Sequence, residues 1–167
     1  SAKNTASGQK AIQPLNDTAV PLISVIILTY KDQDAVYRTL DTVFSQDYPN
    51  IELIVSDDAS GEQDRQQIED YIMLHKRGNL DGFKVIRNES NLGTVAHANK
   101  AARISKGIFI KFISCGDGPY SGHALTQLYE FAEACPQPVV TSVSAVCSRD
   151  FHKTYYLYPS KRHVRML

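Results

Sequence analysis

Dense apolar runs recur along the chain and alternate with amphipathic segments. Residues 22–28 (LISVIIL) and 51–55 (IELIV) carry β-branched and leucine side chains with little alternation. Such runs are typical of strands that are buried on both faces of a parallel sheet. Shorter apolar runs at residues 83–86, 108–113 and 139–146 complete a prediction of five strands.

The segments between these runs have helical periodicity. Val36, Leu40, Val43 and Phe44 fall on one face of a predicted helix. Further helices are predicted at residues 62–76, 94–105 and 122–134. Strands that alternate with helices predict an α/β fold with a Rossmann-like, mainly parallel sheet flanked by helices. Ligands of such sheets bind beyond the carboxyl ends of the strands, so we expect the chemistry in the loops there.

Composition and charge restrict the class of protein. The chain has 167 residues, 43% of them hydrophobic, which suits one globular domain. Its 18 basic and 18 acidic side chains balance, which argues against a nucleic-acid partner. The three cysteines have no CxxC spacing and predict neither a disulfide framework nor a zinc site. The sequence carries neither GxxxxGK[ST] nor GxGxxG, which disfavours P-loop nucleotidases and NAD-binding domains.

Three segments are expected: a flexible leader at residues 1–20, a folded domain at 21–148, and a basic segment with interleaved tyrosines at 149–167. The leader lacks the apolar core of a signal peptide, and the longest apolar run is too short to cross a bilayer. We therefore expect the protein in the cytoplasm, where it can work at the cytoplasmic face of the membrane.

The segment 149–167 has five basic residues and one acidic residue, a net charge of +4. One interpretation is contact with a phosphorylated or lipid-linked acceptor, with a membrane surface, or with a partner subunit in a homo-oligomer. The other is a solvated tail or the beginning of an acceptor domain, and this second interpretation is favoured.

Two adjacent carboxylates, Asp57 and Asp58, directly follow the second predicted strand. One interpretation is recognition of a polar ligand such as a base N–H or a ribose hydroxyl. The other is a capping loop, in which one Asp or Ser60 caps the helix that starts near Glu62. The two roles are compatible, since one carboxylate can cap while the other binds.

A further acid, Asp117, lies in the glycine-containing loop 114–118 after the fourth predicted strand. A carboxylate there suits a hard cation such as Mg²⁺ or Mn²⁺, although a simple Gly-Asp-Gly-Pro turn explains the same residues. Cys115 is a poor match to those cations and is not assigned as a ligand. His97 has no partner that the spacing identifies, so a surface or packing role is expected.

Four pieces of sequence, taken in order, resemble the nucleotide-sugar half of the family-2 glycosyltransferases, which have the GT-A fold. They are PLISVIILTY at residues 21–30, SQDYPNIELIVSDDAS at 45–60, Asn91-Leu92-Gly93 with Asn99, and KGIFI at 106–110, which leads to the position of the Asp-x-Asp motif at 114–117. The resemblance covers about residues 21–135.

The resemblance implies a role for each loop. Tyr30 would lie against the uracil of a UDP-sugar, and Asp58 would accept from the uracil N–H or hold the ribose. Asp117 would hold a Mn²⁺ or Mg²⁺ ion that bridges the diphosphate. The implied nucleotide-binding residues are Leu28, Thr29, Tyr30, Asp57, Asp58, Asn91, Gly93 and Asn99.

The chain departs from the family's pattern at four positions. Lys31 replaces an Asn, Ala98 replaces an Arg, and Ser114 and Gly116 replace two acids. The last two leave Asp117 alone, so metal affinity is expected to fall or the binding mode to change. No residue matches the family's general base by motif, and no catalytic residue is assigned.

The predicted function is that of an inverting hexosyltransferase of polysaccharide biosynthesis. It would move a sugar from a UDP-sugar to a hydroxyl of a glycan, a lipid-linked acceptor or a protein. The alternative is a UDP-sugar-binding or interaction module of the same fold that has lost activity. An unrelated α/β nucleotide-binding protein is disfavoured by the ordered motifs.

Overall fold

The computed structural model describes residues 20–61, 65–135, 139–140, 142 and 144–158. The expected leader lies outside these residues apart from its last position, and so do residues 159–167 of the expected basic segment.

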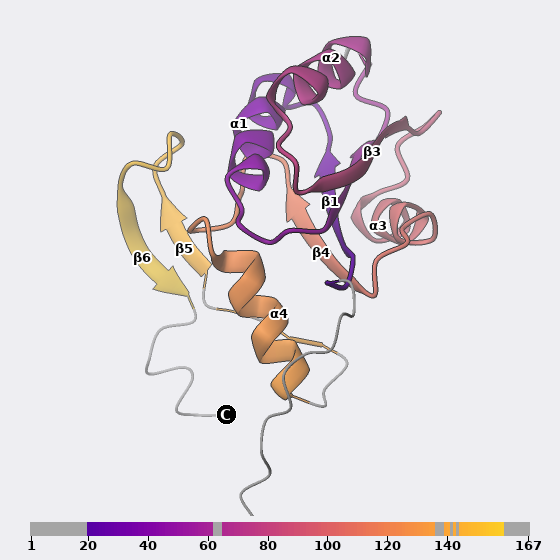
Figure 1. Cartoon of the computed structure of the whole chain (residues 1–167). Helices are drawn as coiled ribbons and strands as arrows, with labels where there is room; N and C mark the ends of the chain where they lie inside the picture. Colours follow the sequence, from indigo (N-terminus) through magenta and orange to yellow (C-terminus); the bar gives the residue numbers. More distant parts are fainter. Residues whose placement is uncertain (1–19, 62–64, 136–138, 141, 143, 159–167) are drawn as a thin grey trace, which may run out of the picture.

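Four parallel strands form the central sheet (Figure 1). In chain order they are β1 (Ile23–Thr29), β2 (Ile51–Asp57), β3 (Leu80–Arg87) and β4 (Phe109–Ser114). Their order across the sheet is β3-β2-β1-β4, and every pairing is parallel. The predicted α/β fold with a parallel sheet is confirmed.

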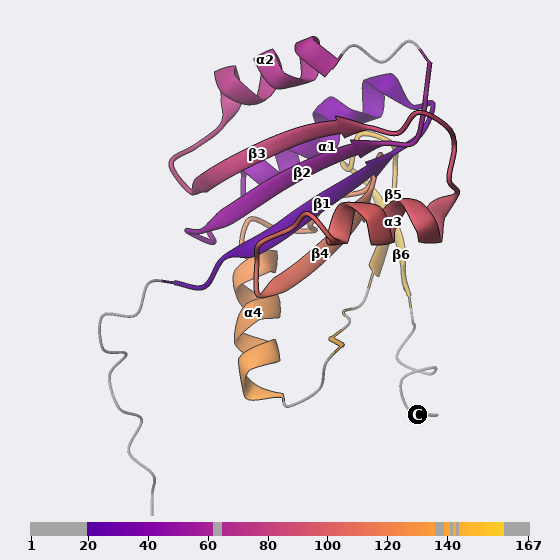
Figure 2. The ribbon, with the colours of Figure 1, turned by 90° about the vertical axis from the view of Figure 1, so that its right-hand side faces the viewer.

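Helices cover both faces of this sheet, as Figure 2 shows. On one face lie α1 (Gln33–Phe44) and α2 (Arg65–His75), and on the other lies α3 (Thr94–Ala102). A fourth helix, α4 (Ala124–Ala134), contacts the beginning of β4 through the edge-to-face pair of Tyr129 and Phe109. The crossovers between parallel strands thus supply the helices that bury the sheet.

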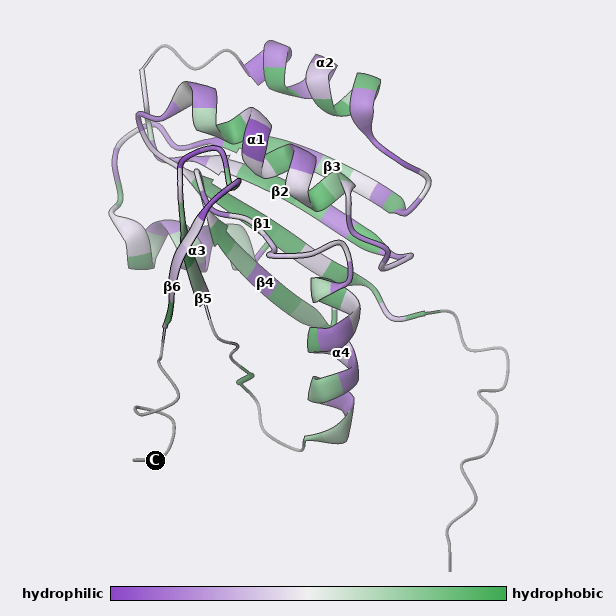
Figure 3. Ribbon diagram, turned by 90° about the vertical axis from the view of Figure 1, so that its left-hand side faces the viewer, coloured by the Kyte–Doolittle hydropathy of each residue, from purple (hydrophilic) through white to green (hydrophobic). Residues whose placement is uncertain are grey.

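The core is densest at β1 and β2, which are buried on both faces and form the most hydrophobic band in Figure 3. On the side of α1 and α2, Val25, Leu53 and Leu40 belong to a large apolar cluster. On the side of α3, Ile26, Ile54 and Ala101 form a smaller one. This two-sided burial explains the continuous apolar runs in the sequence.

The expectation for the fifth strand was wrong in one respect. β5 (Ser144–Cys147) pairs antiparallel with β6 (Thr154–Tyr158) in a separate two-stranded sheet. The turn between them is closed by a bond from the Ser148 amide to the Lys153 carbonyl, 2.7 Å. The segment is rich in serine and threonine, and an interior parallel strand needs a longer apolar run. The boundary expected at residue 148 therefore falls within this hairpin.

Part of the motif at residues 45–60 stabilises the architecture. The buried Tyr48 donates its hydroxyl to the Pro21 carbonyl at 2.6 Å, and burial raises the pKa of Tyr48 to about 12. Gln46 accepts from the Leu125 amide and donates to the Ser121 carbonyl, which fixes the beginning of α4. The two bonds of Gln46 join residues 75 and 79 positions apart in the chain.

Glu52 is a second motif residue with a structural role. It is 5% exposed and accepts hydrogen bonds from the Ser24 hydroxyl at 2.6 Å and the Lys106 amide at 2.7 Å. Burial alone would raise the pKa of Glu52, but these bonds and the Lys84 ammonium lower it instead. Gly107 then crosses β1 so closely that a Cβ would lie 2.4 Å from the Ser24 backbone nitrogen.

Gly107→Ala is therefore expected to destabilise the domain by about 1–3 kcal/mol, because the added methyl group has no space and displaces the turn before β4. Urea unfolding followed by circular dichroism measures the change. Gly78→Ala is the control, since a Cβ there meets nothing within 4 Å. Equal losses of stability in both variants would contradict the close approach at Gly107.

Candidate functional site

The carboxyl ends of three strands meet at one edge of the sheet. Thr29 of β1 lies opposite Asp57 of β2, and Leu28 lies opposite Ser114 of β4. Backbone bonds connect the loops that follow, from the Asp58 amide to the Thr29 carbonyl and from the Cys115 amide to the Leu28 carbonyl. The loops that the sequence singled out are therefore neighbours in space.

A cavity of about 310 Å³ opens at this edge. Most of the predicted nucleotide-binding residues surround it, and Asp57 and Asn99 do not. Its lining comes from three strand ends and from the beginning of α3: Leu28, Thr29, Tyr30, Asp58, Asn91, Gly93, Thr94, His97 and Ser114. Six of the eight residues predicted from the sequence are thus brought together, and their roles toward a ligand remain predictions.

Asp58 organises the wall of this cavity. It is 3% exposed, and its carboxylate accepts from the Leu92 amide at 2.9 Å, the Gly93 amide at 3.0 Å and the Asn88 side chain at 2.8 Å. Burial by itself would raise the pKa of Asp58, but the hydrogen bonds from Leu92 and Asn88 outweigh it and lower that pKa. Sequence reasoning missed this positioning role.

Asp57 has a different role from its neighbour. Its carboxylate accepts hydrogen bonds from the amide and the hydroxyl of Ser60, and Arg87 lies 3.5 Å away. These contacts close the turn after β2. Asp57 therefore closes a turn, whereas Asp58 lines the cavity. The helix start near Glu62 that one Asp or Ser60 was expected to cap lies among residues 62–64, outside the described part of the chain.

Tyr30 is the exposed aromatic residue of the cavity, with 45% of its surface accessible. The Lys31 ammonium lies 4.9 Å from the centre of its ring. Hydrogen bonding by Lys31 and Asn91 lowers the pKa of Tyr30. Lys31 has a φ of 57°, a left-handed conformation that Asn tolerates better than Lys, which accounts for the Asn in the family's pattern.

His97 is a cavity residue that sequence reasoning did not identify. It projects from α3, is 3% exposed, and its Nε2 lies 2.7 Å from the Ser56 hydroxyl. Of the two roles expected for His97, its burial excludes the surface role and agrees with packing, and the ring also forms part of the cavity wall. Asn99, two residues further along α3, is exposed and lines neither described cavity.

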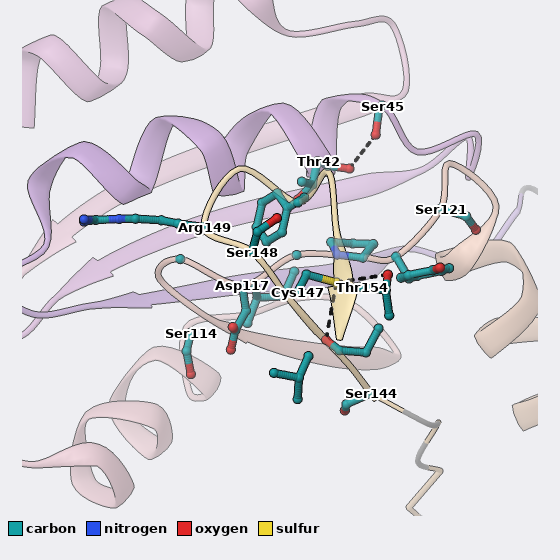
Figure 4. Close-up of a pocket in the computed structure, with 18 of the residues that line it drawn as sticks. Thr42, Ser45, Ser114, Asp117, Ser121, Ser144, Cys147, Ser148, Arg149 and Thr154 are labelled. Carbon is teal, nitrogen blue, oxygen red and sulfur yellow. Dashed lines mark hydrogen bonds between the residues drawn. The ribbon is translucent and has the colours of Figure 1, made fainter. Parts of the chain in front are cut away.

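A second cavity, of about 920 Å³, lies between β4, the loop after it and the β5–β6 hairpin (Figure 4). Asp117 lines this larger cavity, together with Lys111, Arg149 and His152. Ser114 lines both cavities, so they meet at the end of β4. A ligand longer than a nucleoside can therefore extend from the smaller cavity into the larger one.

Thr39 of α1 holds the loop that contains Asp117. Its hydroxyl, which is fully buried, accepts from the Gly116 amide at 3.0 Å and donates to the Asp117 carbonyl at 2.9 Å. Gly118 packs against Thr42 so closely that a Cβ would lie 2.4 Å from its hydroxyl oxygen. Nothing in the sequence around Thr39 predicted that it would hold this loop.

The loop after β4 offers one carboxylate to a divalent cation, so the other ligands of such an ion would have to come from the diphosphate and water. Asp117 is the one acid in the loop, and Gly116 has a φ of 93°, a conformation that disfavours any side chain there. Burial raises the pKa of the Cys115 thiol and keeps it protonated. Within the described residues, no three His, Cys, Asp or Glu side chains are grouped to hold a metal ion.

Comparison with known proteins now identifies the chain. The family model of glycosyl transferase family 2 matches residues 24–165. The chain belongs to this family. The expected GT-A fold is confirmed by the solved structures that it resembles.

Individual relatives of this family-2 chain cover part of it. One relative is WfaP of Escherichia coli, the UDP-Glc:alpha-D-GlcNAc-diphosphoundecaprenol beta-1,3-glucosyltransferase. The two sequences are 33% identical over 98 residues, and this match covers 58% of this chain and 36% of WfaP. The chain therefore spans little more than a third of this relative's length. Its described helices include none that is long and apolar enough to cross a membrane.

Two solved structures support the fold. One is S. aureus TarS 1–349 in complex with UDP, with 29% identity and a TM-score of 0.57 over 67% of this chain and 32% of that one. The other is the mannosyltransferase PcManGT from Pyrobaculum calidifontis in complex with GDP-Man and Mn²⁺. It has 23% sequence identity and a TM-score of 0.63, and the match covers 81% of this chain and 38% of that one. Divalent metal is thus present in one structure of this fold.

Asp58→Asn is expected to lower the free energy of unfolding at pH 7 by about 2 kcal/mol, because the amide NH₂ replaces one of the two accepting oxygens and leaves a backbone N–H of Leu92 or Gly93 facing a donor. The lowered pKa means that the folded state holds this proton less tightly than the unfolded chain. The wild-type contribution is therefore present above pH 4 and falls as the pH drops through the folded-state pKa.

Urea unfolding at pH 7 and pH 3 measures this difference, which should shrink at the lower pH. Asp81→Asn, at an exposed carboxylate of β3, is the control and should change stability by less than about 0.5 kcal/mol. A difference between Asp58→Asn and wild type that is as large at pH 3 as at pH 7 would refute the assignment.

Proposed function

We propose that this family-2 domain binds a UDP-sugar and transfers its hexose, with inversion, to an acceptor hydroxyl in polysaccharide biosynthesis. The observation that carries this proposal is the cavity of about 310 Å³ at the strand ends, where Tyr30 and Asp58 face the same space. Such an edge is the ligand site of open parallel sheets.

The chemistry of the lining supports a position for the donor. The uracil stacks on Tyr30, and Asp58, whose two oxygens accept three hydrogen bonds within the protein, retains capacity for one from the base or ribose. The diphosphate then passes Ser114 into the larger cavity. The UDP complex of TarS and the UDP-Glc in the name of WfaP support a uridine donor.

The acceptor belongs in the larger cavity in this proposal. A lipid-linked glycan is favoured among the three acceptor classes, since the name of WfaP specifies a diphosphoundecaprenol acceptor. Lys111 and Arg149 in the cavity lining suit an acceptor that carries phosphate. Action on such an acceptor would place the protein at the cytoplasmic face of the membrane.

The metal that the family resemblance implies is not part of the proposed step. Asp117 is the candidate ligand, but it stands alone in a loop whose geometry disfavours a second acid at Gly116. The same isolation of Asp117 supports the second candidate function, a binding module of the same fold that does not turn over its ligand.

Tyr30→Ala should weaken UDP binding by about tenfold, because stacking of a base on an aromatic ring contributes about 1–3 kcal/mol. Isothermal titration calorimetry with UDP measures the loss. Tyr155→Ala, which removes an exposed tyrosine of the hairpin, serves as the control and should leave the affinity unchanged. Wild-type affinity in Tyr30→Ala would exclude the proposed position of the base.

Turnover separates the enzyme from the binding module. The full-length protein is incubated with UDP-glucose and, as acceptor, a short-chain lipid diphosphate that carries GlcNAc, and released UDP is measured. Acceptor-dependent release of UDP is the expected result. Tight UDP binding without turnover of UDP-glucose or UDP-GlcNAc would favour the module.

A further inference from the structure

Basic side chains gather where the loop after β4, which holds one acid, faces the larger cavity. Lys111, Arg149 and His152 line it, and Asp117 is the single carboxylate among the described lining residues. The Lys111 ammonium has no hydrogen-bonding or ionic partner within the described part of the chain. The cavity therefore offers cations to a ligand in place of a group of metal-binding acids.

Arg149 is the best placed of these cations. Figure 4 shows its side chain extending from the hairpin along α1, and its Nη2 lies 3.8 Å from Asp32 Oδ1. The other oxygen of Asp32 is 4.0 Å from the point that a Cβ on Gly116 would occupy. Asp32 thus lies between the guanidinium and the position at which the loop lacks an acid, and it follows Tyr30, on which the base is proposed to stack, by two residues.

The contact between Arg149 and Asp32 is easily exchanged. The two side chains are 79% and 44% exposed, and exposed ion pairs of this length contribute little to stability. A diphosphate offers a guanidinium several charged oxygens and two-pronged hydrogen bonds. Arg149 can therefore leave Asp32 for a phosphate at small cost.

The departures from the family's pattern make the site more positive in sum. Ser114 and Gly116 remove two negative charges, Lys31 adds one positive charge and Ala98 removes one. The site therefore carries two more positive charges than the family's pattern would give it. This difference equals the charge of the divalent cation that the missing acids would help to hold.

We propose that Arg149, assisted by Lys111, neutralises the diphosphate of the donor directly, so that nucleotide binding does not require a divalent cation. This rests on the proposed function. During transfer the bond between the sugar C1 and the β-phosphate oxygen breaks, and its electron pair stays on that oxygen. The acceptor oxygen bonds to C1 and its proton is released to solvent. The guanidinium then stabilises the charge that accumulates on UDP.

Titration calorimetry of the protein with UDP and with uridine, in EDTA and in MnCl₂, tests the inference. In EDTA we expect UDP to bind within about threefold of its affinity in MnCl₂. Arg149→Ala should weaken UDP about tenfold, the equivalent of one strong contact to phosphate, and leave uridine unchanged. Arg149→Lys should recover part of the loss.

Lys153→Ala is the matched control, because Lys153 is a cation of the same hairpin that contacts Tyr155 and does not line the cavity. Binding of UDP that needs MnCl₂, or equal UDP affinity of Arg149→Ala and wild type, would overturn this inference and leave the donor site standing. If neither UDP nor uridine binds under any condition, the proposed function itself fails.

Discussion

The parallel pairing of β1 with both of its neighbours is the constraint on which the rest of this structure depends. Because β2 and β4 run in the same direction as β1, the carboxyl ends of all three strands lie at one edge of the sheet. β1 and β2 are buried along their length and leave little room for polar chemistry in the middle of the sheet. The loops at the edge therefore carry Tyr30, Asp58 and Asp117, each of which follows a different strand.

A family motif in this chain serves architecture as well as recognition. Within residues 46–58, Gln46, Tyr48 and Glu52 bind the backbone of distant segments, and Asp57 closes its own turn. Only Asp58 lines the candidate donor cavity, and it does so while it holds the loop before α3 through two backbone amides. Replacing it would change the shape of the cavity as well as a contact to the ligand, so binding and stability measurements need to be read together.

The sequence predicted the parts of the molecule that depend on local pattern. Continuous apolar runs located the four strands of the sheet, and the motifs that resemble family 2 located six of the residues around the smaller cavity. It did not predict Thr39 beneath the Asp117 loop or His97 against Ser56, since these pairs are 41 to 78 residues apart and neither member has a local signature. The fifth strand was misplaced because its antiparallel partner, β6, lies in a segment that was interpreted by charge alone.

Backbone geometry and charge act together at the loop after β4. Gly116 has a positive φ, and a side chain there would point toward Ala35 and Asp32. An acid introduced at this single position would adopt a strained conformation and would meet the like charge of Asp32, which itself contacts Arg149. A second metal-binding acid could therefore not be regained at position 116 without strain. The loop conformation, the glycine and the arginine agree with an arrangement in which protein cations meet the phosphates.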